Sequence, residues 1–361
     1  MLMFIHSLMS LFLSPADTLL VGSYTQQGNP GIEIVDTKSK RVLESLAVPQ
    51  ASYQLITPDQ QYLFSVSELV GNAGAVHGFK KSGSGTWEKT NQQITEGDAP
   101  CHINYRKKSQ TIYTANYMGG SVSVFQTSKG VIAPLAQKIE FAGRGKYPQQ
   151  TTPHAHMVVL SQDEQTMHIS DLGADRVYHY RVQANGLLEG GLNYTQFPEG
   201  TGPRHFIFSA DEKFVYVVGE LSGTVDVYAV QGSNWTPVQR ETIDFSKGEG
   251  PKASADIHIS PNGKWLVASN RITQNSLIVF KSVPNGKLVF SREVGVGKVP
   301  RNFQFDSTGK KIFVACKDEN LIQQFSFNPA TGEMSDLNDD IQIKSPVALL
   351  DVRRWTLDGG R

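Results

Sequence analysis

Arginine, histidine and glutamate side chains beside apolar runs are the residues of this sequence whose types and spacing suit chemistry. His154 and His156 stand two positions apart, so an extended strand would place both side chains on the same side. Arg204, Arg271 and Arg301 also adjoin apolar runs, where guanidinium groups need anionic partners if they are buried. Arginine binds carboxylate or phosphate bidentately, and a histidine beside a carboxylate can move protons near neutral pH. This set predicts a site for an anionic, oxygen-rich small molecule.

The same positions also have structural explanations. Short polar residues that follow an apolar run commonly cap turns, which is the interpretation favoured for Asp171, Asn116 and Asn270. A lone histidine is usually a hydrogen-bonded structural residue, and three histidines are interpreted in this way: His102, His205 and His258. Glu220 can simply neutralise a buried arginine, and Tyr117 can pack at a rim.

Composition and the motifs that are missing narrow the chemistry. Lysine plus arginine number 34 and aspartate plus glutamate also number 34, so no net field favours nucleic acid or an anionic membrane. No serine-centred nucleophile elbow, phosphate-binding glycine loop or dinucleotide fingerprint occurs in suitable context. The two cysteines, Cys101 and Cys316, are too few for a disulfide scaffold and are expected to be buried. No cofactor and no metal are expected, and the favoured partner is a small molecule.

A repeated pattern indicates the elements that position these residues. A turn resembling Ser-Pro-Asn-Gly-Lys, followed by a short apolar run, occurs six times, at 57–67, 106–116, 161–171, 209–219, 260–270 and 306–316. A seventh run without the turn opens the series at 18–23. The residues just after these runs are 44 to 55 positions apart: Tyr24, Glu68, Tyr117, Leu172, Glu220, Arg271 and Lys317. That period is typical of propeller blades.

Each repeat divides into four strand-like pieces, and the ends of the series complement one another. In the fifth repeat the pieces are 203–209, 214–220, 223–230 and 235–245, rich in β-branched and aromatic residues. The series opens at a second-type strand, 18–23, and ends at an unused first-type strand, 346–352. The last strand should therefore pair with the first and close the ring. The sequence predicts an all-β, seven-bladed propeller with four antiparallel strands per blade in a single domain, residues 18–353, with a C-terminal tail at 354–361.

Strand direction then brings the candidate residues together. Consecutive strands are antiparallel, so the start of each innermost strand and the end of the second strand lie on one face of the disc. Polar groups from several blades should converge there at the mouth of the central channel. The predicted catalytic residues are His156, Glu220, Arg204 and Arg271. The predicted substrate-binding residues are His154, Arg301, Asn270, Lys317 and Asp171.

The N-terminal segment leaves the compartment open. Residues 1–13 are nearly all apolar and are followed by small residues, as in a secretory signal, yet they lack lysine and arginine. The segment is too short to span a bilayer, and no other stretch resembles a span. Residues 1–17 are therefore interpreted as a leader of a cytoplasmic protein or, alternatively, as a signal peptide of an exported one. A monomer or weak homodimer is expected.

Long segments of the chain resemble a known family. The segments PHAHMVVLSQDEQTMHISDLGADRVYHY, GTGPRHFIFSADEKFVYVVGEL, SADIHISPNGKWLVASNR and VPRNFQFDSTGKKIFVACKDEN are similar to those of the lactonase-type seven-bladed propellers, the group of bacterial 6-phosphogluconolactonase and fungal carboxymuconate cyclase. The resemblance covers about residues 19–350. It implies lactone chemistry without a nucleotide cofactor and a site at His156, Arg204, Glu220 and Arg271. Two departures are Met157, where the family often has serine, and the polar stretch INYRKKS at 103–109.

These observations together favour a carboxylic-ester hydrolase that opens 6-phospho-D-glucono-1,5-lactone. In this hypothesis His156 activates water, Glu220 orients an arginine or the histidine, and Arg204 and Arg271, with Arg301 and Lys317, hold phosphate or polarise the carbonyl. A lactonising cyclase of the carboxymuconate type remains an alternative, with the arginines on carboxylates. A metal-dependent lactonase would use the His154 and His156 pair with Asp171 or Glu220. A non-catalytic propeller that binds partners at its rim is the third alternative, although the Trp-Asp dipeptide pattern of such scaffolds is missing.

Overall fold

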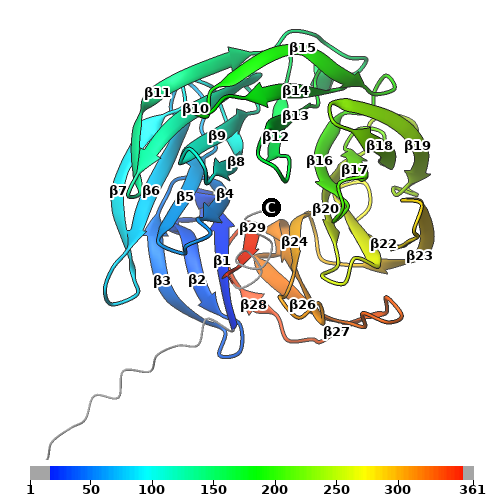
Figure 1. Cartoon of the computed structure of the whole chain (residues 1–361). Helices are drawn as coiled ribbons and strands as arrows, with labels where there is room; N and C mark the ends of the chain where they lie inside the picture. The colour runs from blue at the N-terminus through cyan, green and yellow to red at the C-terminus, as the bar shows by residue number, and fades with distance from the viewer. Residues whose placement is uncertain (1–16, 353–361) are drawn as a thin grey trace, which may run out of the picture.

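Seven antiparallel sheets, six of four strands and one with a short fifth strand, are arranged in a ring in the computed structural model, which describes residues 17–352 (Figure 1). The predicted seven-bladed propeller is confirmed. The blades, from the innermost strand outward, are β29 (Pro346–Asp351), β1 (Thr18–Ser23), β2 (Gly31–Asp36) and β3 (Arg41–Ala47); β4 (Ala51–Ile56), β5 (Tyr62–Ser67), β6 (Ala75–Lys81) and β7 (Trp87–Ile94); β8 (Pro100–Arg106), β9 (Thr111–Asn116), β10 (Ser121–Ser128) and β11 (Val131–Glu140); β12 (Ala155–Leu160), β13 (Thr166–Asp171), β14 (Arg176–Val182) and β15 (Leu188–Gln196); β16 (Pro203–Phe208), β17 (Phe214–Gly219), β18 (Thr224–Gln231) and β19 (Asn234–Thr242); β20 (Ser254–Ile259), β21 (Trp265–Asn270), β22 (Ser276–Ser282) and β23 (Leu288–Gly295); and β24 (Pro300–Phe305), β25 (Lys311–Cys316), β26 (Leu321–Phe327) and β27 (Met334–Asp336). A short strand, β28 (Ile341–Gln342), also pairs with β26 in the last blade. Three 3₁₀ turns complete the described elements: η2 (Thr25–Gln27), η3 (Pro148–Gln150) and η4 (Lys317–Glu319).

The ring closes between the first and last described strands, as predicted. Strand β29 pairs antiparallel with β1, in a register that sets Leu20 opposite Leu350. All six residues of β29 are buried, because this strand is the innermost of its blade. The predicted leader and the C-terminal tail lie outside the described residues except for Asp17.

The repeated turn motif has a side-chain explanation. In the turn between β12 and β13, the Ser161 hydroxyl donates to Asp163 Oδ1 at 2.6 Å and accepts from the backbone nitrogen of Thr166 at 3.0 Å. Serine at the start of the turn and aspartate or asparagine two residues later make equivalent bonds after β16 and β20. The motif recurs because these bonds satisfy the backbone of a tight turn between the two innermost strands of a blade.

The core lies between the blades. Apolar side chains on the facing sides of two neighbouring sheets form each cluster; Val124 of the third blade and Val158 of the fourth, for example, belong to one cluster.

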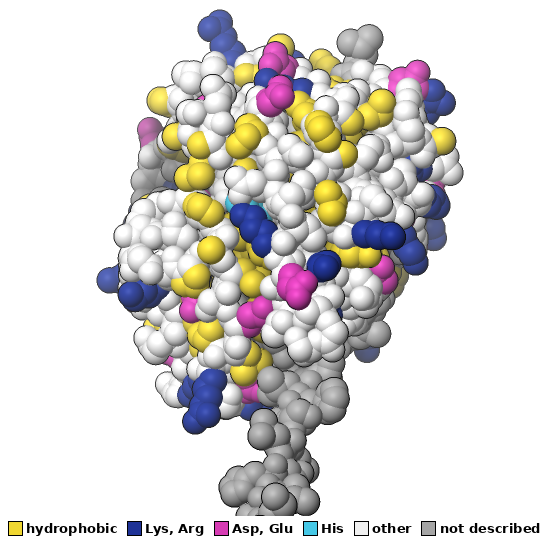
Figure 2. All heavy atoms as spheres, turned by 90° about the vertical axis from the view of Figure 1, so that its left-hand side faces the viewer, with side chains coloured by type: hydrophobic (Ala, Val, Ile, Leu, Met, Phe, Trp, Pro, Cys, Tyr) yellow, Lys and Arg dark blue, Asp and Glu magenta, His cyan; other side chains and the backbone are white. Residues whose placement is uncertain are grey.

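Cys101 and Cys316 are buried and free, as expected. No helix in residues 17–352 is long and apolar enough to cross a membrane. On the face shown in Figure 2, lysine and arginine are interspersed with aspartate and glutamate.

The innermost strands share a register irregularity where they begin. In each of the six blades that start with an innermost strand, pairing to the second strand shifts within the first residues, as between Ala155 and Met157 or between Pro203 and Phe206. Such bulges re-aim side chains beside the point where pairing begins. These positions lie where the candidate site residues are found.

Candidate active site

The residues that directly follow the second strands are the candidates for the rim of the channel mouth. Six of them are polar or charged: Tyr24, Glu68, Tyr117, Glu220, Arg271 and Lys317. The innermost strands contribute deeper residues, so that the rim and the deeper layer together can surround a small molecule.

Two arginines from neighbouring blades share one carboxylate. The Glu220 carboxylate has Arg204 Nε 2.8 Å from Oε2 and Arg271 Nη2 3.0 Å from Oε1. The Arg204 N–H is not aimed at the oxygen, so this contact is an ion pair without a well-formed hydrogen bond. Arg204 is 1% exposed and donates from Nη1 to the Ala255 carbonyl at 2.6 Å. Burial, with the charge of Arg271, lowers the pKa of Arg204 to about 10, so this guanidinium remains charged at neutral pH.

A second ion pair joins residues that lie far apart in the sequence. Arg301 Nη2 donates to Glu68 Oε2 at 3.1 Å, and the Tyr24 hydroxyl donates to the same oxygen at 2.8 Å. The Arg301 guanidinium also lies 5.4 Å from the centre of the Tyr24 ring. Burial alone would lower the pKa of Arg301, but Tyr24 and Glu68 hold it above its ordinary value. Burial raises the pKa of Tyr24, which keeps its hydroxyl protonated as a donor.

His156 is a buried, neutral imidazole beside these charges. Burial is the main reason that its pKa lies well below the ordinary value, and the charge of Arg204 lowers it further. Its ring lies edge-to-face with those of Tyr117 and His205, at centroid distances of 5.4 Å and 5.1 Å. Its buried Nδ1 has no hydrogen-bond partner among the described residues. A neutral imidazole with a free nitrogen can accept a proton.

His154 lies against the same tyrosine but makes different contacts. Its ring stacks on Tyr117 with centroids 4.5 Å apart, and its Nδ1 donates to the Tyr117 carbonyl at 2.9 Å. Its backbone nitrogen donates to Asp171 Oδ1 at 2.7 Å. Asp171 also accepts from the backbone nitrogens of Gly173 and Ala174, and burial raises its pKa to about 6. Asp171 thus caps the turn that follows β13.

The remaining two predicted site residues make local contacts. Asn270 is fully buried, accepts from the Ser254 hydroxyl at 2.6 Å and donates to the Ile243 carbonyl at 2.5 Å. Lys317 pairs with the adjacent Asp318. Within residues 17–352, neither side chain forms a hydrogen bond or ion pair with Arg204, Glu220 or Arg271.

Asp256 is a buried carboxylate that accepts hydrogen bonds from three side chains near the mouth. The sequence pattern did not mark it as a site residue. Asp256 accepts from His205 Nδ1 at 2.7 Å, from His258 Nε2 at 3.0 Å and from Asn302 Nδ2 at 2.5 Å. The pKa of Asp256 is held well below its ordinary value; burial opposes this shift, and His258 and His205 outweigh the burial. His205 lines, with His156, Arg204 and Arg301, a narrow cavity of about 10 Å³, close to the size of one water molecule.

Three further rim residues were present in the sequence pattern without being assigned to the site. Tyr24, Glu68 and Tyr117 occupy the same repeat position as Glu220 and Arg271. That shared position was the signal that could have assigned them. Among the described residues, no group of three or more histidine, cysteine, aspartate or glutamate side chains is arranged to hold a metal ion.

The fold and the mouth define the class of protein: a closed propeller with arginine-carboxylate pairs and a neutral histidine at one opening, an arrangement suited to acid-base chemistry on a small molecule. The chain belongs to the family described as lactonase, seven-bladed β-propeller, whose model matches residues 18–350. A 6-phosphogluconolactonase of Formosa agariphila is 30% identical over 347 residues, which cover 92% of this chain and 98% of the relative.

Solved structures agree with this assignment. A Bacteroides fragilis protein described provisionally as a 6-phosphogluconolactonase superposes with a TM-score of 0.87 at 33% identity, covering 92% of this chain and 97% of that one. The periplasmic gluconolactonase of Pseudomonas aeruginosa superposes with the same TM-score at 31% identity, covering 92% and 98%. The predicted family and the predicted enzyme class, a carboxylic-ester hydrolase, are confirmed by these relatives.

Proposed function

We propose that this protein hydrolyses the lactone of a six-carbon aldonic acid, with 6-phospho-D-glucono-1,5-lactone as substrate and 6-phosphogluconate as product. The observation that carries the proposal is the neutral, buried His156 beside the Arg204, Glu220 and Arg271 array. The name of the Formosa agariphila relative supports this choice of lactone.

The proposed reaction needs one base and one cationic group. His156 accepts a proton from water while the water oxygen bonds to the lactone carbonyl carbon. The carbonyl oxygen gains negative charge in the tetrahedral intermediate, and a guanidinium stabilises it. The ring carbon–oxygen bond then breaks, and the leaving oxygen takes the proton back from the His156 imidazolium. The product is the open-chain hydroxy acid, and no cofactor is consumed.

The two arginines at Glu220 are suited to different tasks. The Arg271 side chain is 12% exposed and reaches the rim, so it is assigned to the substrate oxygen. The Arg204 side chain is 1% exposed and is held by a backbone carbonyl, so it is assigned to positioning Glu220. Glu220 in turn holds Arg271 in place by the 3.0 Å ion pair.

The charge balance at the mouth favours a second candidate, the unphosphorylated glucono-1,5-lactone. Three guanidinium groups face two carboxylates, Glu68 and Glu220, and each guanidinium is already paired with one of them. A phosphate monoester with nearly two negative charges would meet only about one uncompensated positive charge. The Pseudomonas aeruginosa neighbour is named a gluconolactonase, and this name also supports the unphosphorylated lactone as the second candidate.

A direct comparison of the two lactones tests the proposal. Purified protein is assayed for loss of each lactone, corrected for spontaneous hydrolysis, with and without EDTA. Faster loss of at least one lactone, unchanged by EDTA, is expected. Glu220→Gln should lower kcat/KM by about 100-fold or more, since Arg271 loses its anchor, while the exposed Glu199→Gln serves as the matched control. No acceleration of either lactone would reject the proposal, and a rate abolished by EDTA would replace it with metal-assisted hydrolysis.

A further inference from the structure

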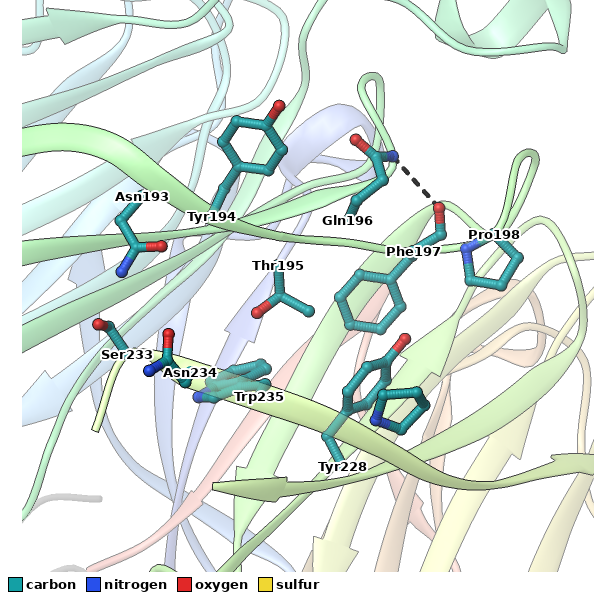
Figure 3. Close-up of a pocket in the computed structure, with 11 residues that line it drawn as sticks. Asn193, Tyr194, Thr195, Gln196, Phe197, Pro198, Tyr228, Ser233, Asn234 and Trp235 are labelled. Carbon is teal, nitrogen blue, oxygen red and sulfur yellow. Dashed lines mark hydrogen bonds between the residues drawn. The ribbon is translucent and has the colours of Figure 1, made fainter. Parts of the chain in front are cut away.

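Two hollows in the described part of the chain differ in the chemistry of their linings. The larger, of about 440 Å³, lies between the outermost strands of the fourth and fifth blades (Figure 3). Its Phe197, Tyr228 and Trp235 rings are 2%, 4% and 7% exposed, and no histidine or charged side chain is among its lining residues. The narrow cavity beside His156 is lined instead by histidines, which can accept a proton, and by arginines, which can stabilise an anion.

Successive residues of the innermost strands form the wall and the floor of this narrow cavity. The wall residues are each the second residue of their strand: Ser52, Cys101, His156, Arg204, Arg301 and Val347. The floor residues are each the third: Tyr53, His205 and Asn302. Alternation would turn successive side chains to opposite faces, but the register shifts at the starts of β4, β16 and β24 let both line one cavity. His205 therefore lies below Arg204, on the side away from the mouth.

Asp256 determines which nitrogen of the His205 ring carries hydrogen. Asp256 is 2% exposed, and its pKa stays well below the ordinary value although burial opposes this shift, so the carboxylate is ionised and only accepts hydrogen bonds. The 2.7 Å bond between His205 Nδ1 and Asp256 Oδ1 therefore requires hydrogen on Nδ1. Burial lowers the pKa of His205 to about 4, so the ring is neutral at pH 7 and Nε2 carries a lone pair.

His205 Nε2 is thus a hydrogen-bond acceptor without a partner within residues 17–352, on a ring that lines the cavity. The His156 ring lies edge-to-face with the His205 ring, with centroids 5.1 Å apart, and its buried Nδ1 is also unpaired in this part of the chain. The cavity of about 10 Å³ can hold one water molecule, which needs about two to four polar partners. The two imidazoles can supply two of them.

We propose that His205 is a second catalytic histidine, whose Nε2 accepts a hydrogen bond from the water that attacks the lactone, and that Asp256 is its positioning residue. This role rests on the proposed lactone hydrolysis. The water donates one O–H to His205 at the floor and the other to His156 at the wall, so its lone pairs face the mouth. A lactone bound at the rim then meets an oxygen whose direction is already fixed.

The two protons of this water follow different routes. As the oxygen bonds to the lactone carbonyl carbon, the O–H directed at His156 breaks and its proton passes to that imidazole. The other proton stays on the oxygen, hydrogen-bonded to His205, while the ring carbon–oxygen bond breaks and the leaving oxygen takes the proton from His156. The carboxylic acid product loses the remaining proton to solvent on release, so His205 stays neutral throughout.

Two variants of His205 separate its acceptor from its packing. His205→Phe keeps a buried ring without an acceptor and should lower kcat by about 10-fold or more, with KM changed less than about threefold, because the substrate contacts at the rim remain. His205→Gln puts an amide oxygen near the position of Nε2 and should restore part of the lost kcat. Circular dichroism melts check that each variant is folded.

His258→Phe is the matched control. His258 Nε2 donates to the other oxygen of the same carboxylate at 3.0 Å, but this residue does not line the cavity. A purely structural role of Asp256 predicts equal losses of kcat for His205→Phe and His258→Phe. The proposed role predicts that His258→Phe keeps kcat within about threefold of the wild type.

Nitrogen NMR of wild-type protein labelled with ¹⁵N-histidine measures the tautomer, with the His205 signals assigned from their absence in His205→Gln. Hydrogen on Nδ1 and none on Nε2 is expected at pH 7, and this decides the case even where His205→Phe fails to fold. Hydrogen on Nε2, full kcat of His205→Phe, or equal losses in both phenylalanine variants would overturn the proposal. With an active wild type these results reject only the role of His205, whereas a wild type inactive on both lactones rejects the proposed function itself.

Discussion

The buried charges at the mouth are nearly balanced by one another. Glu220 and Glu68 each hold arginine side chains that are less than 15% exposed, and these arginines come from three different blades. Burial, and after it the charge of Arg204, lowers the pKa of His156, so the residue stays neutral where an isolated histidine would be partly charged. His156 is therefore available as a neutral base, and among the described residues its Nδ1 is not bonded to a carboxylate.

His156→Ala should reduce kcat/KM for the proposed lactone hydrolysis by about 100- to 10,000-fold, the usual range for loss of a general base. The wild-type kcat/KM, corrected for spontaneous hydrolysis, should stay level as the pH falls from 7.5 to about 6, because the pKa of His156 lies well below 6.5. Stopped-flow or pH-indicator rates across this range provide the measurement. A wild-type rate that halves near pH 6.5 would point to a base with an ordinary histidine pKa.

At the scale of elements, the beginnings of the innermost strands decide where site side chains are placed. Strand β16 carries Arg204 and His205, and the loop before it is tied to the fourth blade by Asp175. Asp175 accepts from the backbone nitrogens of Gly200 and Gly202, at 2.8 Å and 2.7 Å, and from the side chain of Gln150 at 2.8 Å. One buried carboxylate thus fixes the start of the strand.

Asp175→Ala should destabilise the protein by about 2 kcal/mol, because buried backbone N–H groups lose their acceptor. It should also lower lactone turnover, because Arg204 lies two residues after Gly202. Chemical denaturation and a steady-state assay measure the two effects, with the exposed Glu199→Ala as the control in the same loop. Full stability and activity of the Asp175 variant would show that the loop holds its place without the carboxylate.

At the scale of the whole molecule, closure of the ring depends on β29. This strand is the innermost of the first blade, and it packs beside β24 and β4 of the neighbouring blades. Its Val347, Leu349 and Leu350 are buried. Without it, β1 becomes an open edge and the first blade loses its innermost layer.

Deletion after Ser345 should remove about 5 kcal/mol of stabilisation, estimated from burial of three large apolar side chains. That amount is comparable to the whole stability of a typical domain, so the shortened chain should melt far below the intact one or fail to fold. Thermal unfolding followed by circular dichroism measures this. A chain ending at Val352 keeps every described strand and serves as the control, and equal melting of the two would contradict closure by β29.

The buried histidines should make the propeller sensitive to acid. Burial lowers the pKa to about 4 for His77, His179 and His205, and well below 6.5 for His102, His156 and His168. Between about pH 6.5 and 4 the unfolded chain therefore binds more protons than the folded one, so stability falls as the pH falls. Each pKa unit of difference corresponds to about 1.4 kcal/mol.

Asp171 acts in the opposite direction, because burial raises its pKa to about 6, and burial also raises the pKa values of Glu33, Glu44 and Asp340. The six buried histidines outnumber these four carboxyl groups. The melting temperature should therefore decrease steadily from pH 7 to pH 5 at constant ionic strength. Scanning calorimetry gives the comparison. A melting temperature that is unchanged or higher at pH 5 would contradict this account.

The sequence alone determined the architecture and which strand ends share one face of the disc. Turn motifs repeat because each blade needs the same tight connection between its two innermost strands, and apolar alternation repeats because every sheet is packed between two others. Those signals are local, so they can be read along the chain. The shared repeat position also marked Glu220 and Arg271, as well as Tyr24 and Glu68, as rim residues.

The tertiary structure alone decided which of these residues meet. Glu68 and Arg301 are 233 positions apart and pair only because the ring brings their blades together at the channel. The bulges at the starts of the innermost strands change the direction of side chains, so simple alternation could not predict that His156 and Arg204 line the same narrow cavity. Pairing across blades depends on the closed ring, and no sequence spacing encodes it.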